Sequence, residues 1–368
     1  MISIFLLFFL QFVVLPFGMT RFETPKVILA ELGVQALLVA AILSKKYRPQ
    51  ISKKFLPIAG IFALVVLGLV ISQTPIRSLF GNAFRLQGAF LALHLLIWAA
   101  LSSLYGLKKT PTFILWAVGV LLLQTLIIFG TNTTGRFIGT LGEGNALAGS
   151  VVFLLPFLVY QNKRWPRMVA ILGALIIVAL SGSRSGIIAL GLELLFIGLT
   201  QLTSLSLKQT FIACLLIIPL TLVLPFVEEA VYYQKYNSKA LYKFESRAQI
   251  WQIAGLAGLA KPILGWGFGN TELALHQTAV KRNNDLQYVT VDSSHNIFLD
   301  FWVEGGVVGL ALMAWLLHTS IKGLLRQANP LYMSIFIGIQ VVLLFNPLSV
   351  VNLLQYWWIL GLGLAELT

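Results

Sequence analysis

Continuous apolar runs, separated by short polar connections, cover most of the chain. The runs are unbroken, which suits α-helices that cross about 30 Å of hydrocarbon. Strands of a membrane β-barrel would instead alternate apolar and polar residues. The pattern predicts an all-α fold, that of a polytopic integral membrane protein with about twelve spans. The expected spans are residues 2–18, 27–43, 55–72, 87–105, 111–130, 145–161, 167–181, 185–203, 208–226, 296–319, 331–347 and 350–366.

Composition supports a membrane protein. The chain has 368 residues, of which 58% are hydrophobic and 11% charged, and its mean hydropathy is +0.87; a soluble domain has about 25% charged residues. The single cysteine, Cys214, lies in an apolar run, so no disulfide framework can form within one chain. Residues 2–18 carry no Lys or Arg ahead of the apolar run and no cleavage site after it, so we expect a first span rather than a signal peptide.

The net charge of +13 is spread over the connections between apolar runs. The connections after even-numbered spans hold more Lys and Arg residues than the short connections after odd-numbered spans. Loops rich in Lys and Arg stay in the cytoplasm. We therefore expect a protein of the bacterial inner membrane with both termini in the cytoplasm. Its partners would include membrane lipids, and the positive charge does not require a nucleic-acid partner. Residues 1–368 then form a single membrane domain.

One long connection, residues 227–294, is expected on the outer side, between the ninth and tenth spans. Within it "SRAQIWQIAGLAGLAK" (246–261) reads as a short amphipathic helix at the interface, and "PILGWGFGN" (262–270) ends it. We expect this outer loop to carry part of an active site.

The stretch "SGSRSG" (181–186) interrupts an apolar region with one arginine, Arg184. The predicted topology puts Arg184, Arg247 and His295 on the same outer face. A guanidinium suits bidentate phosphate binding, and a histidine can take a proton from a hydroxyl. Each residue alone also has a structural interpretation: a lipid-headgroup anchor, an ordinary loop charge and a hydrogen-bonding histidine, respectively.

Other motifs do not support cofactor chemistry. "GWGFGN" lies outside any βαβ unit, so it is not a dinucleotide fingerprint. The chain contains no Asp-x-Asp pair, and His94, His276 and His318 lack metal-ligand spacing. We expect neither a metal nor a cofactor.

Six stretches together are similar to a known family. They are "RFETPK" (21–26), "FGNAFRLQGAF" (80–90), "TGRFIGTLGEGNALAGSVVFLLP" (134–156), "SGSRSG" (181–186), "RAQIWQIAGLAGLAKPILGWGFGN" (247–270) and "DSSHNIFLDFWVEGGVVGLALMAWL" (292–316). In this order, with a long outer loop before the tenth span, they resemble the bacterial O-antigen ligase/polymerase superfamily of membrane glycan transferases.

The resemblance implies a metal-independent glycosyltransferase of cell-envelope polysaccharide biosynthesis. Such an enzyme moves an oligosaccharide from a polyprenyl-pyrophosphate carrier, such as undecaprenyl pyrophosphate, to an acceptor hydroxyl outside the cytoplasmic membrane. Members of the family differ in their acceptor. An O-antigen ligase uses a lipopolysaccharide lipid core, a polymerase extends another glycan, and a third kind of transferase modifies protein. The sequence does not decide among these.

The same resemblance implies roles for individual residues. Arg184 and Arg247 would bind the pyrophosphate and stabilise its charge as it leaves, and His295 would be the general base. Arg136 and Arg85 are further candidates for phosphate or sugar contacts, and Asn145 for a polar contact at a helix start. The "GEGN" at 142–145 departs from the family's more usual Asn-Pro-Asn-like form, so the family's contacts there need not carry over.

Two other functions fit a membrane protein of this kind. A lipid-linked glycan flippase or transporter would line a midplane cavity with ionisable residues and would show an internal repeat. The sequence shows no such repeat. A peptidoglycan polymerase of the shape-and-division type would place a key acid in an outer loop, where Asp285 and Asp292 are available. A non-catalytic scaffold is the remaining alternative.

Overall fold

The computed structural model describes residues 1–44, 52–72, 74–104, 111–132, 135–161, 164–227, 230, 246–347 and 349–365. Over these residues the regular secondary structure is helical, apart from an isolated antiparallel bridge between Thr131 and Phe137. The α-helices are α1 (Ile2–Ile4), α2 (Glu23–Leu43), α3 (Leu56–Val70), α4 (Pro75–Phe80), α5 (Ala89–Leu104), α6 (Thr112–Phe129), α7 (Gly144–Val159), α8 (Arg164–Ser181), α9 (Arg184–Leu202), α10 (Leu207–Leu222), α12 (Arg247–Ala260), α13 (Thr271–Lys281), α14 (Ile297–Gln327), α15 (Pro330–Phe345) and α16 (Val350–Leu364). The short helices are η1 (Phe5–Phe9), η2 (Leu10–Phe12), η3 (Lys53–Phe55), η4 (Gly139–Leu141) and η6 (Asp285–Tyr288).

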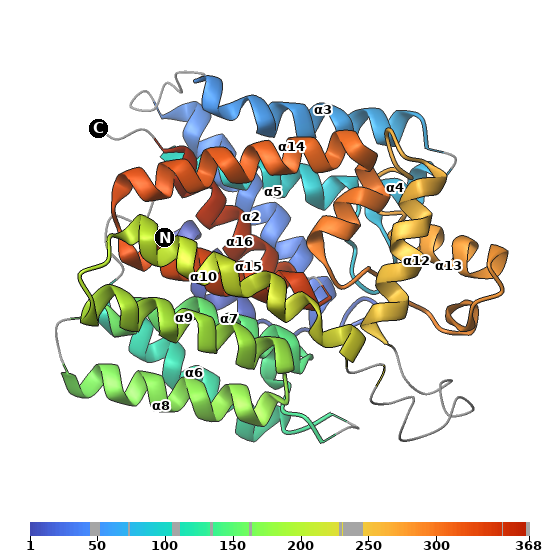
Figure 1. The fold of residues 1–368 in the computed structure, drawn as a ribbon. Coiled ribbons are helices and arrows are strands. Elements are labelled where there is room, and N and C mark those ends of the chain that lie inside the picture. The colour runs from blue at the N-terminus through green and yellow to red at the C-terminus, as the bar shows by residue number, and fades with distance from the viewer. Residues whose placement is uncertain are drawn as a thin grey trace.

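The long helices lie side by side in one bundle, and α12 and α13 gather at one end of it (Figure 1). Seven helical segments in the described residues are long and apolar enough to cross a membrane, and five more apolar helices are shorter. The all-helical membrane architecture expected from the sequence is therefore present. The count of twelve spans and the orientation of the termini stay predictions.

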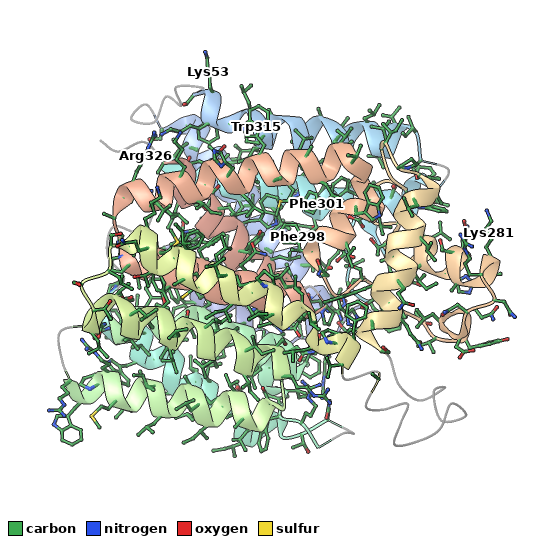
Figure 2. The ribbon with its side chains drawn as sticks, viewed as in Figure 1. Lys53, Lys281, Phe298, Phe301, Trp315 and Arg326 are labelled. Carbon is green, nitrogen blue, oxygen red and sulfur yellow. The ribbon has the colours of Figure 1, made fainter. Side chains whose placement is uncertain are left out.

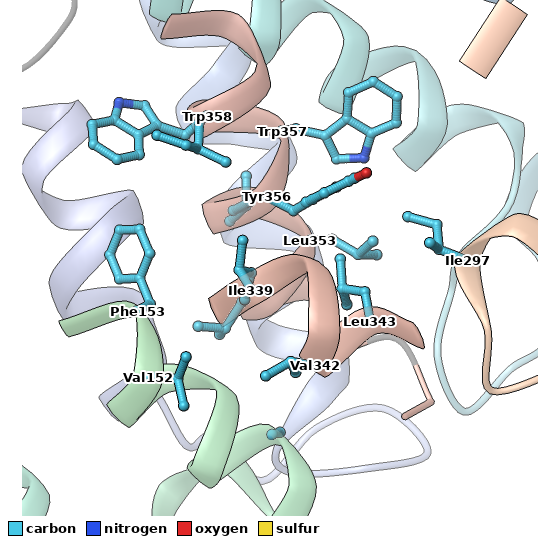
Figure 3. Close-up of a cluster of buried hydrophobic side chains, with 14 of the residues drawn as sticks. Val152, Phe153, Ile297, Ile339, Val342, Leu343, Leu353, Tyr356, Trp357 and Trp358 are labelled. Atoms are coloured by element: carbon cyan, nitrogen blue, oxygen red, sulfur yellow. The ribbon is translucent and has the colours of Figure 1, made fainter. Parts of the chain in front are cut away.

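The centre of the bundle is α16, whose residues are all buried. Side chains from α7, α14, α15 and α16 meet there (Figure 3). Trp98 on α5 donates a hydrogen bond to the carbonyl of Leu354 (2.8 Å), and the hydroxyl of Tyr356 donates to Gln340 on α15 (2.9 Å). A helix that is buried on every side needs neighbours all round, and its polar side chains need hydrogen-bond partners inside the bundle, as Asn352 finds in Gln355 (3.1 Å).

The expected outer loop at 227–294 is largely helical where the structure describes it; residues 228–229 and 231–245 lie outside the described part. The helix expected at 246–261 is α12, and "PILGWGFGN" ends it as expected. Helix α13, which follows directly after this segment, is not among the elements expected from the sequence.

The tenth expected span, 296–319, differs from the observed helix in two ways. The helix α14 continues to Gln327, and it is broken at Gly306, where φ is +60° and ψ is −156°. The break leaves backbone groups without helical partners, and residues 262–267 supply replacements. The amides of Trp266 and Gly267 donate to the carbonyls of Val303 (2.8 Å) and Glu304 (2.9 Å).

The other half of the broken helix is held in the same way. The amide of Val307 donates to the carbonyl of Pro262 (2.8 Å). A Cβ on Gly306 would lie 2.4 Å from the carbonyl oxygen of Ile263, and one on Gly265 would lie 2.4 Å from the carbonyl carbon of Glu304. Only glycines allow the two backbones to approach this closely.

We predict that Gly306→Ala lowers the free energy of unfolding by about 1–3 kcal/mol, because alanine is strained at this positive φ and its Cβ meets Ile263. Thermal unfolding of the purified protein in detergent would show a lower midpoint. Gly198→Ala on α9 is the matched control, since nothing lies within 4 Å of its Cβ position. Equal midpoints for the two variants would contradict a requirement for glycine at the break.

Candidate active site

The turn between α8 and α9 explains the residues of "SGSRSG" one by one. Gly182 has φ +60°, a conformation that favours glycine. The Ser183 hydroxyl caps α9 by accepting from the amide of Gly186 (3.1 Å). A Cβ on Gly186 would lie 2.5 Å from that of Ala148, so α9 and α7 approach closely here. Arg184 is the first residue of α9, and it is exposed at this end of the bundle.

This turn is tied to the end of α15. The hydroxyl of Ser185 donates to the Asn346 side chain (2.6 Å), immediately after α15 ends. Arg247, the first residue of α12, donates from its Nε to the carbonyl of Phe345 (2.7 Å). Two consecutive residues at the end of α15 therefore hold the turn that carries Arg184 and the arginine from the outer segment.

His295 lies just before α14, in a backbone conformation with φ +57°. The loop around it is well determined by hydrogen bonds: the His295 amide donates to the hydroxyl of Ser293 (3.2 Å). The Asn296 side chain caps α14 by accepting from the amides of Phe298 (3.0 Å) and Leu299 (3.3 Å). Such preorganisation fits a side chain that must be held in one orientation.

A carboxylate faces the histidine. The Oδ1 of Asp292 lies 3.9 Å from the Nε2 of His295, and its Oδ2 accepts a hydrogen bond from the Nε of Arg85. A second carboxylate, Glu143, lies 3.5 Å from the Arg85 guanidinium. Arg85 is thus matched by two acidic groups, and it joins the loop before α14 to the start of α7.

Arg136 and Asn145 extend this network. Arg136 donates from Nε to the carbonyl of Ser181 and from its terminal nitrogen to the Oδ1 of Asn145, both at 2.9 Å. The Asn145 amide in turn donates to Glu143 (3.4 Å). Arg136 therefore supports the turn that carries Arg184, and Asn145, the second residue of α7, connects it to Arg85.

The residues picked from the sequence form one continuous arrangement at one end of the bundle. The contacts run from the Arg184 turn through Arg136, Asn145 and Glu143 to Arg85, Asp292 and His295. Glu143 is not among the site residues predicted from the sequence, and Asp292 is predicted only for the peptidoglycan-polymerase alternative. The signal available for Asp292 is its place in "DSSH", three residues before the histidine.

Burial keeps His295 neutral. It lowers the pKa of His295 to about 4; Asp292 opposes this shift, while the positive charges of Arg247 and Arg85 add to it. Arg247 is therefore close enough for its charge to act on the imidazole. A neutral imidazole is the form that can accept a proton.

A cavity of about 90 Å³ adjoins the network. Its polar part includes Arg85, Asp292 and Ser293, and its apolar part includes Leu95 on α5 and Trp357 on α16. The cavity thus leads from the charged residues toward the apolar interior of the bundle. A molecule with both polar and apolar parts suits this lining.

The part of the chain that holds several of these residues is similar to a known protein family. Residues 169–314 match a family model described as O-Antigen ligase. This range contains Arg184, Arg247 and His295, whereas Arg85, Arg136 and Asn145 lie before it.

A curated relative has a related activity in its name. The chain is 26% identical over 216 residues to a "ComP-specific O-oligosaccharyltransferase" of Acinetobacter baylyi (strain ATCC 33305 / BD413 / ADP1). The alignment covers 55% of this chain and 39% of that protein, so the chain spans well under half the length of this relative. The family match over residues 169–314, this relative and the helical membrane architecture agree in supporting a likeness to the O-antigen ligase superfamily.

Proposed function

We propose that the chain transfers an oligosaccharide from a polyprenyl-pyrophosphate carrier to an acceptor hydroxyl, without a metal, at the outer face of the bacterial cytoplasmic membrane. The observation that carries this proposal is the convergence at the end of α15. There Arg247 is held by Phe345, the Arg184 turn is held by Asn346, and the charge of Arg247 reaches His295.

In the proposed reaction, His295 takes the proton from the acceptor hydroxyl. The freed oxygen forms a bond to the anomeric carbon of the donor sugar as the bond from that carbon to the phosphate oxygen breaks. The electron pair leaves with the carrier pyrophosphate, whose charge Arg184 and Arg247 stabilise. This is base catalysis combined with electrostatic stabilisation of a leaving group, and the donor itself supplies the free energy.

The helices around these residues favour the same ligand. The N-termini of α7, α9, α12 and α14 all lie in or beside the network. Each helix N-terminus carries a partial positive charge and unsatisfied amide donors, so it favours an anion. Arg184 and Arg247 add full charges at the first positions of two of these helices.

Asp292 has a supporting role in this mechanism. When His295 takes the proton, the imidazolium carries a positive charge beside Arg247 and Arg85, which disfavours it. The Asp292 carboxylate 3.9 Å away stabilises the imidazolium. Bound pyrophosphate acts in the same direction, because its negative charge opposes the arginines.

We predict that His295→Ala lowers the rate of glycan transfer by about 10²–10⁴-fold, the usual contribution of a general base. Arg184→Ala and Arg247→Ala should each lower it by about 10²–10³-fold, as for lost oxyanion-type stabilisation. The measurement is glycan transfer by purified protein in lipid with a polyprenyl-pyrophosphate oligosaccharide donor and a chelator present.

Arg282→Ala is the control for these variants, because Arg282 is an exposed arginine just after α13 that lies outside the network. It should keep the wild-type rate. Unchanged rates in the three site variants, or no transfer to any acceptor, would refute the site and favour the flippase alternative. The size of the product separates a polymerase from a ligase.

We also predict a pH profile governed by His295. Because only the neutral imidazole acts as a base, kcat/KM should fall tenfold per unit below a pKa of about 4. The pKa observed in the pH dependence of kcat should be higher than the pKa observed in kcat/KM. The reason is that bound pyrophosphate counteracts the arginines, whose charges lower the pKa of His295. Steady-state rates across pH, with recovery of activity checked after return to neutral pH, test this; one unshifted pKa near 6.5 in both parameters would argue against it.

A further inference from the structure

A second polar pocket lies at the end of the bundle away from the candidate active site. It is lined by Lys54, His318, Thr319, Lys322, Gly323, Arg326, Gly363 and Ala365. The helix α14 begins two residues after His295 and ends at Gln327, so its two ends join the two sites. Figure 2 shows the same separation: Lys53 and Arg326 lie at one end, and Lys281 at the other.

Close packing of two helices forms the floor of this pocket. A Cβ on Gly323 of α14 would lie 1.7 Å from the carbonyl oxygen of Gly363 on α16. A Cβ on Gly363 would lie 2.4 Å from the carbonyl oxygen of Ser320. The backbones therefore touch, and because glycine has no side chain, a hollow forms here rather than a ridge, with a cavity volume of about 470 Å³.

Three cationic side chains surround the hollow. Lys322 and Arg326 come from α14, and Lys54 comes from η3, at the start of the neighbouring span. A Cβ on Gly60 of α3 would lie 2.6 Å from the Leu312 side chain, so α3 packs directly on α14. In the described part of the chain, no carboxylate pairs with Lys54, Lys322 or Arg326.

An apolar surface adjoins the cations. Trp315, Thr319, Lys322 and Arg326 follow one another at intervals of three and four residues, so they share one face of α14. Trp315 is 45% exposed, and Leu56, two residues after Lys54, is 49% exposed. Exposed tryptophan beside lysine and arginine at the end of a spanning helix is typical of the membrane interface.

We propose that this pocket binds the phosphate headgroup of an anionic phospholipid, with a two-phosphate lipid of the cardiolipin type as the best fit. The three cations then neutralise two phosphates, and the acyl chains lie along Trp315 and Leu56. Basic pockets between helices at a membrane surface bind such headgroups. The proposal is independent of glycan transfer, because no residue of the candidate active site takes part.

The test is binding of cardiolipin to delipidated, purified full-length protein in detergent, counted by native mass spectrometry during a lipid titration. The double variant Lys54→Gln/Lys322→Gln should bind cardiolipin at least about tenfold more weakly than wild type, because each interfacial cation contributes separately. Lys53→Gln is the matched control: it removes the same charge from the adjacent exposed residue, which does not line the pocket. It should bind as wild type does.

Two further measurements separate a lipid pocket from a free-phosphate site and from diffuse surface charge. Excess inorganic phosphate should not displace cardiolipin; displacement would identify a free-phosphate site and overturn the proposal. A zwitterionic phospholipid should bind wild type and the double variant equally weakly. Equal cardiolipin binding by wild type and the double variant, or an equal loss in Lys53→Gln, would show diffuse surface charge instead of a pocket.

Discussion

The break in α14 at Gly306 is the constraint on which the candidate active site depends. A broken helix inside an apolar bundle needs new partners for its backbone groups, because unsatisfied amides and carbonyls there cost several kcal/mol each. Residues 262–267 supply them, and this segment directly follows α12. These hydrogen bonds therefore fix the position of α12 relative to the first part of α14. Arg247 stands at the start of α12, and His295 lies just before α14.

The four arginines of the site differ in their surroundings. Arg85 is matched by Asp292 and Glu143, so its charge serves to join α7 to the loop before α14. Arg136 is likewise directed at Ser181 and Asn145. Arg184 and Arg247 stand at the first positions of helices, where their charges add to those of the helix ends. This placement at helix N-termini favours Arg184 and Arg247 as the residues that meet an anionic substrate.

Much of this arrangement is readable from the sequence, and the limits have physical causes. Apolar runs mark helices because hydrocarbon requires them, and "SGSRSG" marks a turn because small residues allow close approach and capping. The break in α14 could not be predicted, because "EGG" at 304–306 looks like part of an apolar helix until residues 262–267 dock on it. The pair of Arg85 and Asp292 is separated by 207 residues, and no local pattern joins them.

The proposed choice of arginine and histidine follows from where the reaction takes place. A pyrophosphate leaving group develops charge at the edge of the membrane, where fixed donors and helix ends need little reorganisation to receive it. Histidine complements them only while it is neutral, and burial beside two arginines holds the pKa of His295 low. The same cations that would stabilise the leaving group thus keep the base unprotonated before the donor binds, and the donor's own charge then strengthens the base. In the proposed mechanism, substrate binding and base strength would therefore be coupled through one electrostatic field.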